Sequence, residues 1–290
     1  MKQLKIQWQI GNQCNFRCGY CHHDYHDGSN PMLGYEQFDS ALENIRQSTQ
    51  AYDAISLEFL GGEPTISKAV RHAIAYPTDN RFKFNIMSNG SADLEWWAKA
   101  APNLDIIMLA WHYLADEEHF KKVVELLSKT HDRKHLVVTV NAYPDLWDKA
   151  MQMYEWLNAN GYNGKIKILF SNHNKGNDRY YRSYSSEQVV FFCKENGLPV
   201  PEDTSKYSLS DMEAQLYTDY KSHLCWAGVD QVVIDYFGYV YRGWCMVGNG
   251  YGNVFDGPIK LDTNPRVCTR VLCKNGFDQG AKKSEKGWGL

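Results

Sequence analysis

The sequence has no excess of positive charge and no long apolar run. Its 290 residues include 31 Lys and Arg against 34 Asp and Glu, which gives a formal net charge of -3. Because there is no strong basic field to hold a nucleic acid backbone, we do not expect a nucleic acid partner. No apolar stretch approaches the roughly 20 residues that cross a bilayer, and the N-terminal sequence alternates polar and apolar residues instead of forming a signal-peptide core. We therefore expect a cytoplasmic protein with no membrane partner.

The apolar content and the cysteines narrow the class of protein further. Hydrophobic residues make up 43% of the chain, which is enough for a large packed core. The eight cysteines are poor candidates for disulfides in a reducing compartment. They are instead candidates for metal ligands or for catalysis.

Six apolar, β-rich runs alternate with helical patterns over residues 1–170. The expected strands are 4–10, 54–60, 82–87, 105–111, 135–141 and 165–170. The expected helices are 35–50, 67–76, 92–101, 116–130 and 144–160. This alternation predicts an α/β fold with right-handed βαβ crossovers and a parallel sheet, whether closed, partly closed or open. In each of these architectures the chemistry lies at the carboxyl ends of the strands.

The alternation of expected strands and helices ends after residue 170. A polar, turn-rich bridge follows, with helices expected over 186–196 and 209–222. A hairpin comes next, with strands in VDQVVIDY and YVYRGW and a turn at Phe237-Gly238. The last 70 residues hold four cysteines and little apolar sequence, so we expect a metal centre to stabilise them. The expected domains are 1–170, 171–222 and 223–290.

A triplet of cysteines, Cys14, Cys18 and Cys21, follows the first expected strand with the spacing CxxxCxxC. Three thiolates within eight residues can converge on one centre, and soft sulfur ligands select zinc or iron–sulfur clusters. Three ligands leave one iron of a four-iron cluster open, as a catalytic zinc site leaves one position open. The alternative is a zinc site completed by a nearby histidine: His22, His23 or His26.

The second expected strand runs directly into Gly61, Gly62, Glu63 and Pro64. Two glycines let the backbone approach a ligand closely, and the carboxylate after them can accept hydrogen bonds from an ammonium group. The alternative is an ordinary Gly-Gly turn with a solvated glutamate. The triplet and this motif follow successive strands of one α/β domain. Together they indicate a functional site more strongly than either motif does alone.

The cysteine triplet, with Tyr20 before its last cysteine, and the GGEP sequence resemble the signature of the radical S-adenosylmethionine (SAM) superfamily. The resemblance implies a partial (β/α)6 barrel over residues 1–170. It also implies a 4Fe-4S cluster on the three catalytic cysteines, with an open iron chelated by the amino and carboxylate groups of SAM. One electron from the reduced cluster cleaves the sulfonium, and a deoxyadenosyl radical abstracts hydrogen from the substrate. A reducing partner such as flavodoxin or ferredoxin would supply the electron.

The resemblance also assigns residues around SAM. Glu63 and the adjacent backbone would hold the methionine amino group, and the turn Ser88-Asn89 would border the cofactor unless it is a plain turn. His112 would contact the cofactor or the substrate, or it would be a histidine at the barrel rim whose hydrogen bonds are made within the protein. Ala110 stands where many relatives have a serine. Asn141 would reach the ribose. The expected cofactor-binding residues are Tyr20, Gly61, Gly62, Glu63, Ser88, Asn89, His112 and Asn141.

A second group of cysteines has the spacing C-x19-C-x22-C-x4-C: Cys225, Cys245, Cys268 and Cys273. Four thiolates suffice to close a cluster or a zinc site, and the spacing does not distinguish the two metals. The first two cysteines bracket the expected hairpin. This pattern resembles the twitch or SPASM extension, in which a hairpin and a following helix carry an auxiliary 4Fe-4S cluster.

The two groups use seven of the eight cysteines and leave Cys193 over. Cys193 lies in an apolar helical stretch, which favours a buried, inert thiol. The alternative is a hydrogen-atom donor in a radical epimerase or a peptide-modifying enzyme.

We expect a radical SAM oxidoreductase that acts on a small-molecule or peptide substrate, because a fully ligated auxiliary cluster is suited to accepting an electron. Only thirteen residues precede Cys14, so we expect no fused module for recognising a leader peptide. The rival of a different class is a non-catalytic α/β binding protein stabilised by zinc or iron–sulfur clusters. Such a protein would need the same cysteines but would not need Glu63.

Overall fold

The fold is built around one large sheet. The computed structural model describes residues 2–21, 23–169, 184–200, 202, 219–271, 273 and 275–284. The strands of the first part are β1 (Gln3–Gln9), β2 (Ala54–Leu60), β3 (Phe82–Ser88), β4 (Leu104–Trp111), β5 (Leu136–Ala142) and β6 (Gly164–Ile168). The later strands of the sheet are β8 (Gln231–Ile234), β9 (Tyr239–Tyr241) and β10 (Gly252–Asn253). Their order is β10-β9-β8-β1-β2-β3-β4-β5-β6.

The strands β1 to β6 pair in parallel and in chain order, which confirms the six expected strands. The sheet stays open, because β6 and β10 are its two edges. A partial (β/α)6 barrel is therefore confirmed.

Five helices connect these strands. They are α1 (Tyr35–Ser48), α2 (Lys68–Ala75), α3 (Leu94–Ala100), α4 (Glu117–Leu127) and α5 (Trp147–Ala159). Short 3-10 turns lie at η1 (His23–Tyr25), η2 (Pro64–Ile66), η3 (Ala101–Asn103) and η4 (Pro144–Leu146). Side-chain caps fix three of the helix starts: Ser67 accepts from the Val70 amide, Asp93 from the Trp96 amide and Asp116 from the His119 amide. The five helices expected in this part of the chain are thus confirmed.

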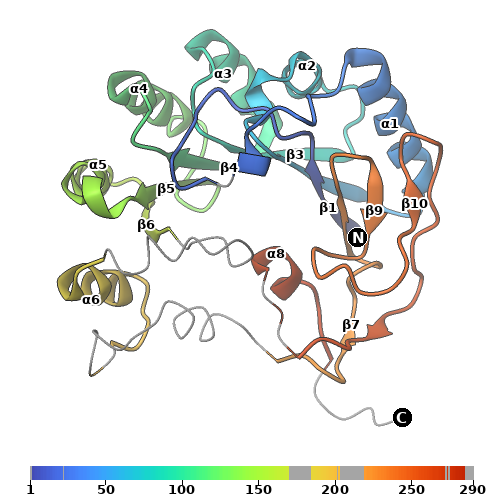
Figure 1. Cartoon of the computed structure of the whole chain (residues 1–290). Coiled ribbons are helices and arrows are strands. Elements are labelled where there is room, and N and C mark those ends of the chain that lie inside the picture. Colours follow the sequence, from blue (N-terminus) through green and yellow to red (C-terminus); the bar gives the residue numbers. More distant parts are fainter. Residues whose placement is uncertain are drawn as a thin grey trace.

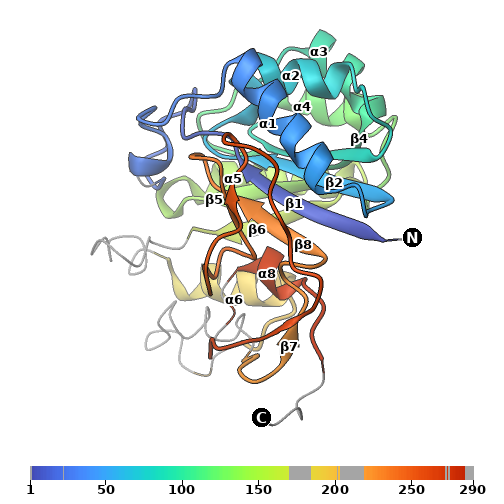
Figure 2. The same ribbon diagram turned by 90° about the vertical axis from the view of Figure 1, so that its right-hand side faces the viewer.

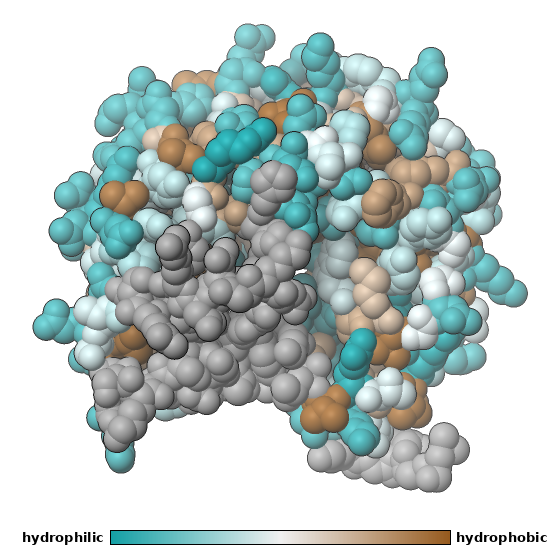
Figure 3. All heavy atoms as spheres, viewed as in Figure 1, coloured by the Kyte–Doolittle hydropathy of each residue, from teal (hydrophilic) through white to brown (hydrophobic). Residues whose placement is uncertain are grey.

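The hydrophobic core lies between the sheet and these helices. Figures 1 and 2 show α1 to α4 covering one face of the sheet, while α5 packs against β5 and β6. The indole of Trp8 on β1 stacks on the ring of Phe38 on α1, with the centroids 5.3 Å apart. Both side chains are fully buried, so this pair ties the first strand to the first helix. In Figure 3 hydrophobic residues are scattered among hydrophilic ones on the visible surface.

After the barrel, α6 (Ser186–Glu195) packs against β6 and begins with a capping box formed by Ser185 and Gln188. The expected helix 186–196 is therefore confirmed. Most of the other expected bridge helix, 209–222, lies outside the described residues, and its last four residues, 219–222, are not helical. Among the described residues, no helix is long and apolar enough to cross a membrane.

The C-terminal hairpin forms as expected from β8 and β9, with Gly238 at a φ of 84° in the turn. It also continues the barrel sheet, because β8 pairs in parallel with β1 from Lys5 to Trp8. Two short strands, β7 (Leu224–Cys225) and β11 (Arg266–Val267), form a separate antiparallel pair, and α8 (Gly276–Gln279) follows. Figure 2 shows β7 and α8 on the side of the sheet opposite α1 to α4. The chain between β10 and β11 instead reaches α1, where Asn44 donates to the Val254 carbonyl at 2.8 Å.

Candidate active site

A cavity of about 410 Å³ lies at the carboxyl ends of the barrel strands. This is the position at which parallel α/β architectures place their chemistry. The structure brings together there every residue expected at the barrel site. The cavity is lined by Cys14, Cys18, Tyr20, Cys21, Gly61, Gly62, Glu63, Ser88, Asn89, His112 and Asn141.

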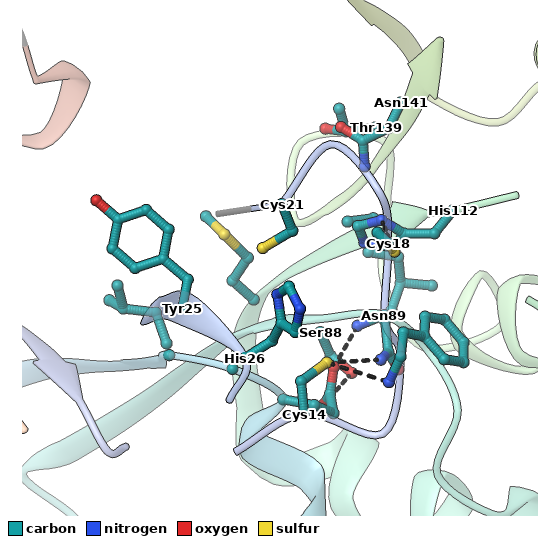
Figure 4. Close-up of a pocket in the computed structure, with 18 of the residues that line it drawn as sticks. Cys14, Cys18, Cys21, Tyr25, His26, Ser88, Asn89, His112, Thr139 and Asn141 are labelled. Atoms are coloured by element: carbon teal, nitrogen blue, oxygen red, sulfur yellow. Dashed lines mark hydrogen bonds between the residues drawn. The ribbon is translucent and has the colours of Figure 1, made fainter. Parts of the chain in front are cut away.

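The three cysteines of the triplet lie on the loop after β1 and edge one hollow, as Figure 4 shows. All three are free thiols. The Sγ atom of Cys14 accepts from the backbone amide of Phe16 at 3.4 Å and lies 4.0 Å from the side-chain Nδ2 of Asn89. Burial raises the pKa of each thiol, that of Cys21 to about 11. A bound metal therefore has to displace protons from this loop.

The donor set fits an iron–sulfur cluster. Thiolates are the ligands that such clusters take, and hydrogen bonds to sulfur tune them. Within the part of the chain that the structure describes, no three histidine, cysteine or acidic side chains form a ready-made site for one metal ion. Metal binding at this loop is therefore coupled to local movement of the thiols.

Glu63 is almost completely buried, with 1% of its surface exposed. Its Oε1 atom accepts from the Thr65 amide at 2.9 Å, the Thr65 hydroxyl at 2.6 Å and the Ser88 hydroxyl at 2.8 Å. Its Oε2 atom accepts from the Asn89 amide at 2.6 Å. Burial raises the pKa of Glu63, and these hydrogen bonds oppose the rise. One acceptor position on Oε2 remains for a further donor.

The two residues before Glu63 have to be glycines because their backbone lies against the backbone of the cysteine loop. The Gly62 amide donates to the Gly11 carbonyl at 3.0 Å, and the Glu63 amide donates to the Gln13 carbonyl at 2.9 Å. A Cβ on Gly62 would lie 2.2 Å from the Gln13 oxygen, and Gly61 has a φ of 148°. The close approach that the motif predicts is thus an approach to the backbone of residues 11–13.

His112 contacts the cysteine loop. Its Nδ1 atom forms a hydrogen bond with the Tyr20 hydroxyl and lies 3.6 Å from the Cys18 sulfur. The rings of His112 and Tyr20 stack with centroids 6.0 Å apart. Burial, together with the charge of Lys167, lowers the pKa of His112 to about 4, so the imidazole is neutral at pH 7. His112 therefore has a structural role, in addition to the cofactor or substrate contact that the sequence predicts for it.

The cavity also has lining residues that the sequence analysis did not select, among them Thr139, Lys167 and His26. Figure 4 shows the His26 ring near Cys14 and Cys21, and Thr139 beside Asn141. The amide of Asn141 donates to the Trp111 carbonyl at 3.2 Å. Period-two alternation in the segment KIKI places both lysines of β6 on one face, but it does not show that this face borders the cavity.

The four cysteines of the second group gather near β7, β11 and α8. Cys225 is buried with Ala227 and Ala281, and Cys268 packs against this cluster. The register of β7 with β11 brings Cys268 beside His223, whose carbonyl accepts from the Cys268 amide at 2.8 Å. Burial raises the pKa of Cys245 and Cys273, with smaller contributions from neighbouring thiols that include Cys225. All four thiols are free.

Asp278 on α8 holds the loop of Cys245 in place. Its buried carboxylate accepts from the Trp244 amide at 2.9 Å and from the Cys245 amide at 2.7 Å. The neighbouring Gln279 side chain donates to the Cys273 carbonyl at 2.8 Å. One short helix thus positions two of the four cysteines.

A buried chain of hydrogen bonds connects this loop to the barrel. The indole of Trp244 donates to the side-chain Oε1 of Gln7 at 2.7 Å, and the side-chain Nε2 of Gln7 donates to Glu58 Oε2 at 2.6 Å. Burial raises the pKa of Glu58. The other carboxylate oxygen of Glu58, Oε1, has no partner among the described residues.

The fold and the site define a partial α/β barrel whose cavity is edged by three free thiols and a buried glutamate. Residues 8–170 match the profile of the Radical SAM superfamily, and the chain belongs to this superfamily. The family expected from the sequence is therefore confirmed.

Two curated relatives share part of the sequence. The chain is 34% identical over 89 residues to an S-adenosylmethionine-dependent nucleotide dehydratase of Selenomonas ruminantium, which is 30% of each protein. It is 26% identical over 138 residues to the GTP 3',8-cyclase of Klebsiella pneumoniae (strain 342), which is 43% of this chain and 41% of that protein. The chain thus matches less than half the length of these relatives.

Solved structures show the same fold over most of the chain. The structure of anSMEcpe with bound AdoMet has a TM-score of 0.54 and 17% identity, and the match covers 87% of this chain and 78% of that one. The structure of Streptococcus suis SuiB bound to the precursor peptide SuiA has a TM-score of 0.53 and 12% identity, with 88% and 63% covered.

Proposed function

We propose that the protein cleaves SAM reductively, abstracts hydrogen from a small-molecule or peptide substrate, and oxidises that substrate. One observation carries the proposal: three free thiols, the Glu63 carboxylate and the Ser88-Asn89 turn meet in one cavity at the strand ends. A 4Fe-4S cluster on the thiols would supply an open iron and the electron that splits the sulfonium of SAM.

The residues of the chain hold and shield this chemistry. The free acceptor position on Glu63 Oε2 faces a donor such as the methionine ammonium of SAM, while its other hydrogen bonds fix the turn at Ser88 and Asn89. Tyr20 and His112 orient Cys18, because the two side chains are hydrogen-bonded to each other and His112 Nδ1 lies 3.6 Å from the Cys18 sulfur. The two rings stack with their centroids 6.0 Å apart, which fixes the orientation of the imidazole.

The second cysteine group is proposed as an auxiliary 4Fe-4S site of the twitch or SPASM kind. Its members are four free thiols around α8, and four thiolates close the coordination of a cubane. A closed cluster has no open iron for substrate, so an electron-transfer role suits it, with the potential set by burial and hydrogen bonds. Zinc in this site is the alternative, and metal analysis decides between the two.

Cys193 favours oxidation over epimerisation. Its side chain is fully buried in the core and is not among the described residues that line the cavity. A hydrogen-atom donor has to reach the substrate radical, whereas a buried thiol on α6 packs against apolar neighbours. The epimerase or peptide-modifying alternative therefore has less structural support than oxidation.

Two substrate classes fit the comparisons. The curated relatives are named for nucleotide substrates, and one solved neighbour is bound to a precursor peptide. A flavodoxin or ferredoxin would supply the electron, and the free thiols call for a reducing compartment such as the cytoplasm.

The test is anaerobic purification with iron and sulfide analysis, followed by incubation with SAM and dithionite. The proposal predicts iron, sulfide and release of 5'-deoxyadenosine. A protein that binds only zinc and leaves SAM intact would instead be the non-catalytic binding protein considered above.

A further inference from the structure

Lys167 stands out among the residues that line the cavity. It lies on β6, the last strand of the barrel, and its side chain is accessible to water inside the cavity. Enough protein surrounds the ammonium that desolvation lowers the pKa of Lys167. Within the described part of the chain, it has neither a hydrogen-bond acceptor nor a carboxylate partner. A lysine that opens into a cavity, with no carboxylate partner among the described residues, can offer its charge to an anionic ligand.

The sheet register places two polar side chains beside Lys167. Asn141 on β5 pairs directly with Lys167, and Thr139 lies two residues earlier on the same face of β5. All three residues line the cavity. In Figure 4 Thr139 and Asn141 lie at the other end of the pocket from Cys14. A hydroxyl and an amide next to an ammonium can together donate to the oxygens of a phosphate or carboxylate.

The described walls of the cavity carry few charged side chains. Among the described lining residues, Lys167 is the only lysine or arginine and Glu63 is the only acidic residue. The hydrogen bonds that Glu63 accepts come from Thr65, Ser88 and Asn89, and none comes from Lys167. Because Lys167 has no carboxylate partner among the described residues, the β5–β6 wall of the cavity favours an anion.

We propose that Lys167, with Thr139 and Asn141, binds an anionic group of the substrate, a phosphate or a carboxylate, at the β5–β6 wall of the cavity. This inference rests on the proposed function, because it takes the thiol end of the cavity as the place of SAM. It makes Lys167 a specificity-determining residue that selects acidic small molecules.

The chain offers a matched control. Lys165 lies two residues before Lys167 on the same face of β6, and it is not among the residues that line the cavity. Lys167→Met and Lys165→Met each remove one positive charge from the same strand, whereas Lys167→Arg keeps the charge. The variants are compared as anaerobically reconstituted, full-length protein by calorimetric titration with SAM, with GTP as the phosphate probe and with succinate as the carboxylate probe.

The proposal predicts that GTP, succinate or both bind the wild type and Lys165→Met, and bind Lys167→Met at least about tenfold more weakly. Which probe binds identifies the anion. SAM affinity and SAM cleavage should be unchanged in all variants, which separates this inference from the proposed function. Equal binding by wild type and Lys167→Met, or no binding of either probe at millimolar concentration, would overturn it. A loss of SAM affinity in Lys167→Met would assign the lysine to the SAM carboxylate instead.

Discussion

Glu63→Gln is the substitution that most clearly separates a ligand-binding role of the buried glutamate from a structural one. The glutamine oxygen can keep the hydrogen bonds that Oε1 accepts from Thr65 and Ser88. Its NH2 group then replaces Oε2 and faces the Asn89 amide, so a donor meets a donor. The lost charge-assisted hydrogen bond should cost about 1.5 to 3 kcal/mol of stability.

The same NH2 group would face the ammonium of SAM. Loss of that contact should weaken SAM binding by about 1.5 to 3 kcal/mol, or roughly 10- to 150-fold in the dissociation constant. Equilibrium dialysis with labelled SAM measures the affinity, and urea unfolding of the metal-free protein measures the stability. Both iron–sulfur clusters should be retained.

Thr65→Val is the control for this substitution. It removes the hydroxyl that donates to Oε1 and leaves the Asn89 contact with Oε2 in place. We expect it to lower the stability by about 1 kcal/mol and to leave SAM affinity unchanged. Unchanged SAM affinity in Glu63→Gln would refute the reasoning and make Glu63 a structural residue of the turn.

Three further predictions concern the remaining cysteines and the buried Glu58. Cys193→Ala should retain turnover once a substrate is found; loss of activity, with solvent deuterium in a product of unchanged formula, would show the epimerase alternative to be right. Replacing Cys268 and Cys273 by Ala should preserve 5'-deoxyadenosine formation but abolish a product two electrons more oxidised; a double variant that still forms this product would remove the auxiliary site from the reaction. Burial raises the pKa of Glu58 above its ordinary 4.5, so this group destabilises the fold increasingly as the pH rises above that value. Glu58→Gln should therefore raise the urea midpoint relative to wild type at pH 8 and have little effect near pH 4.5, whereas an equal effect at both pH values would contradict the assigned cause.

Much of the barrel could be predicted from the sequence, because its strands and helices have distinct periods and regular alternation. Ser88 and Asn89 directly follow an expected strand, and parallel strands bring such ends to one edge. Residues that follow β1, β2 and β3 accordingly line one cavity at that edge.

The remaining features depend on long-range pairing that local sequence does not specify. The hairpin β8–β9 was expected, but its parallel pairing with β1 joins residues more than 200 positions apart. The four hydrogen bonds of Glu63 also come from two separate segments, η2 and the turn at Ser88 and Asn89, and the GGEP motif alone suggests only a carboxylate near a ligand. Lys167 was missed because alternation in a short strand shows which residues share a face but not which face borders the cavity.

The most direct test of the central claim is the iron content and SAM cleavage of a variant in which Cys14, Cys18 and Cys21 are all replaced by Ala. Two cubane sites predict about eight irons in the reconstituted wild type and about four in the variant. The variant should form no 5'-deoxyadenosine, while the second cysteine group keeps its iron. A variant that still cleaves SAM, or a wild-type protein that takes up only zinc, would contradict the account.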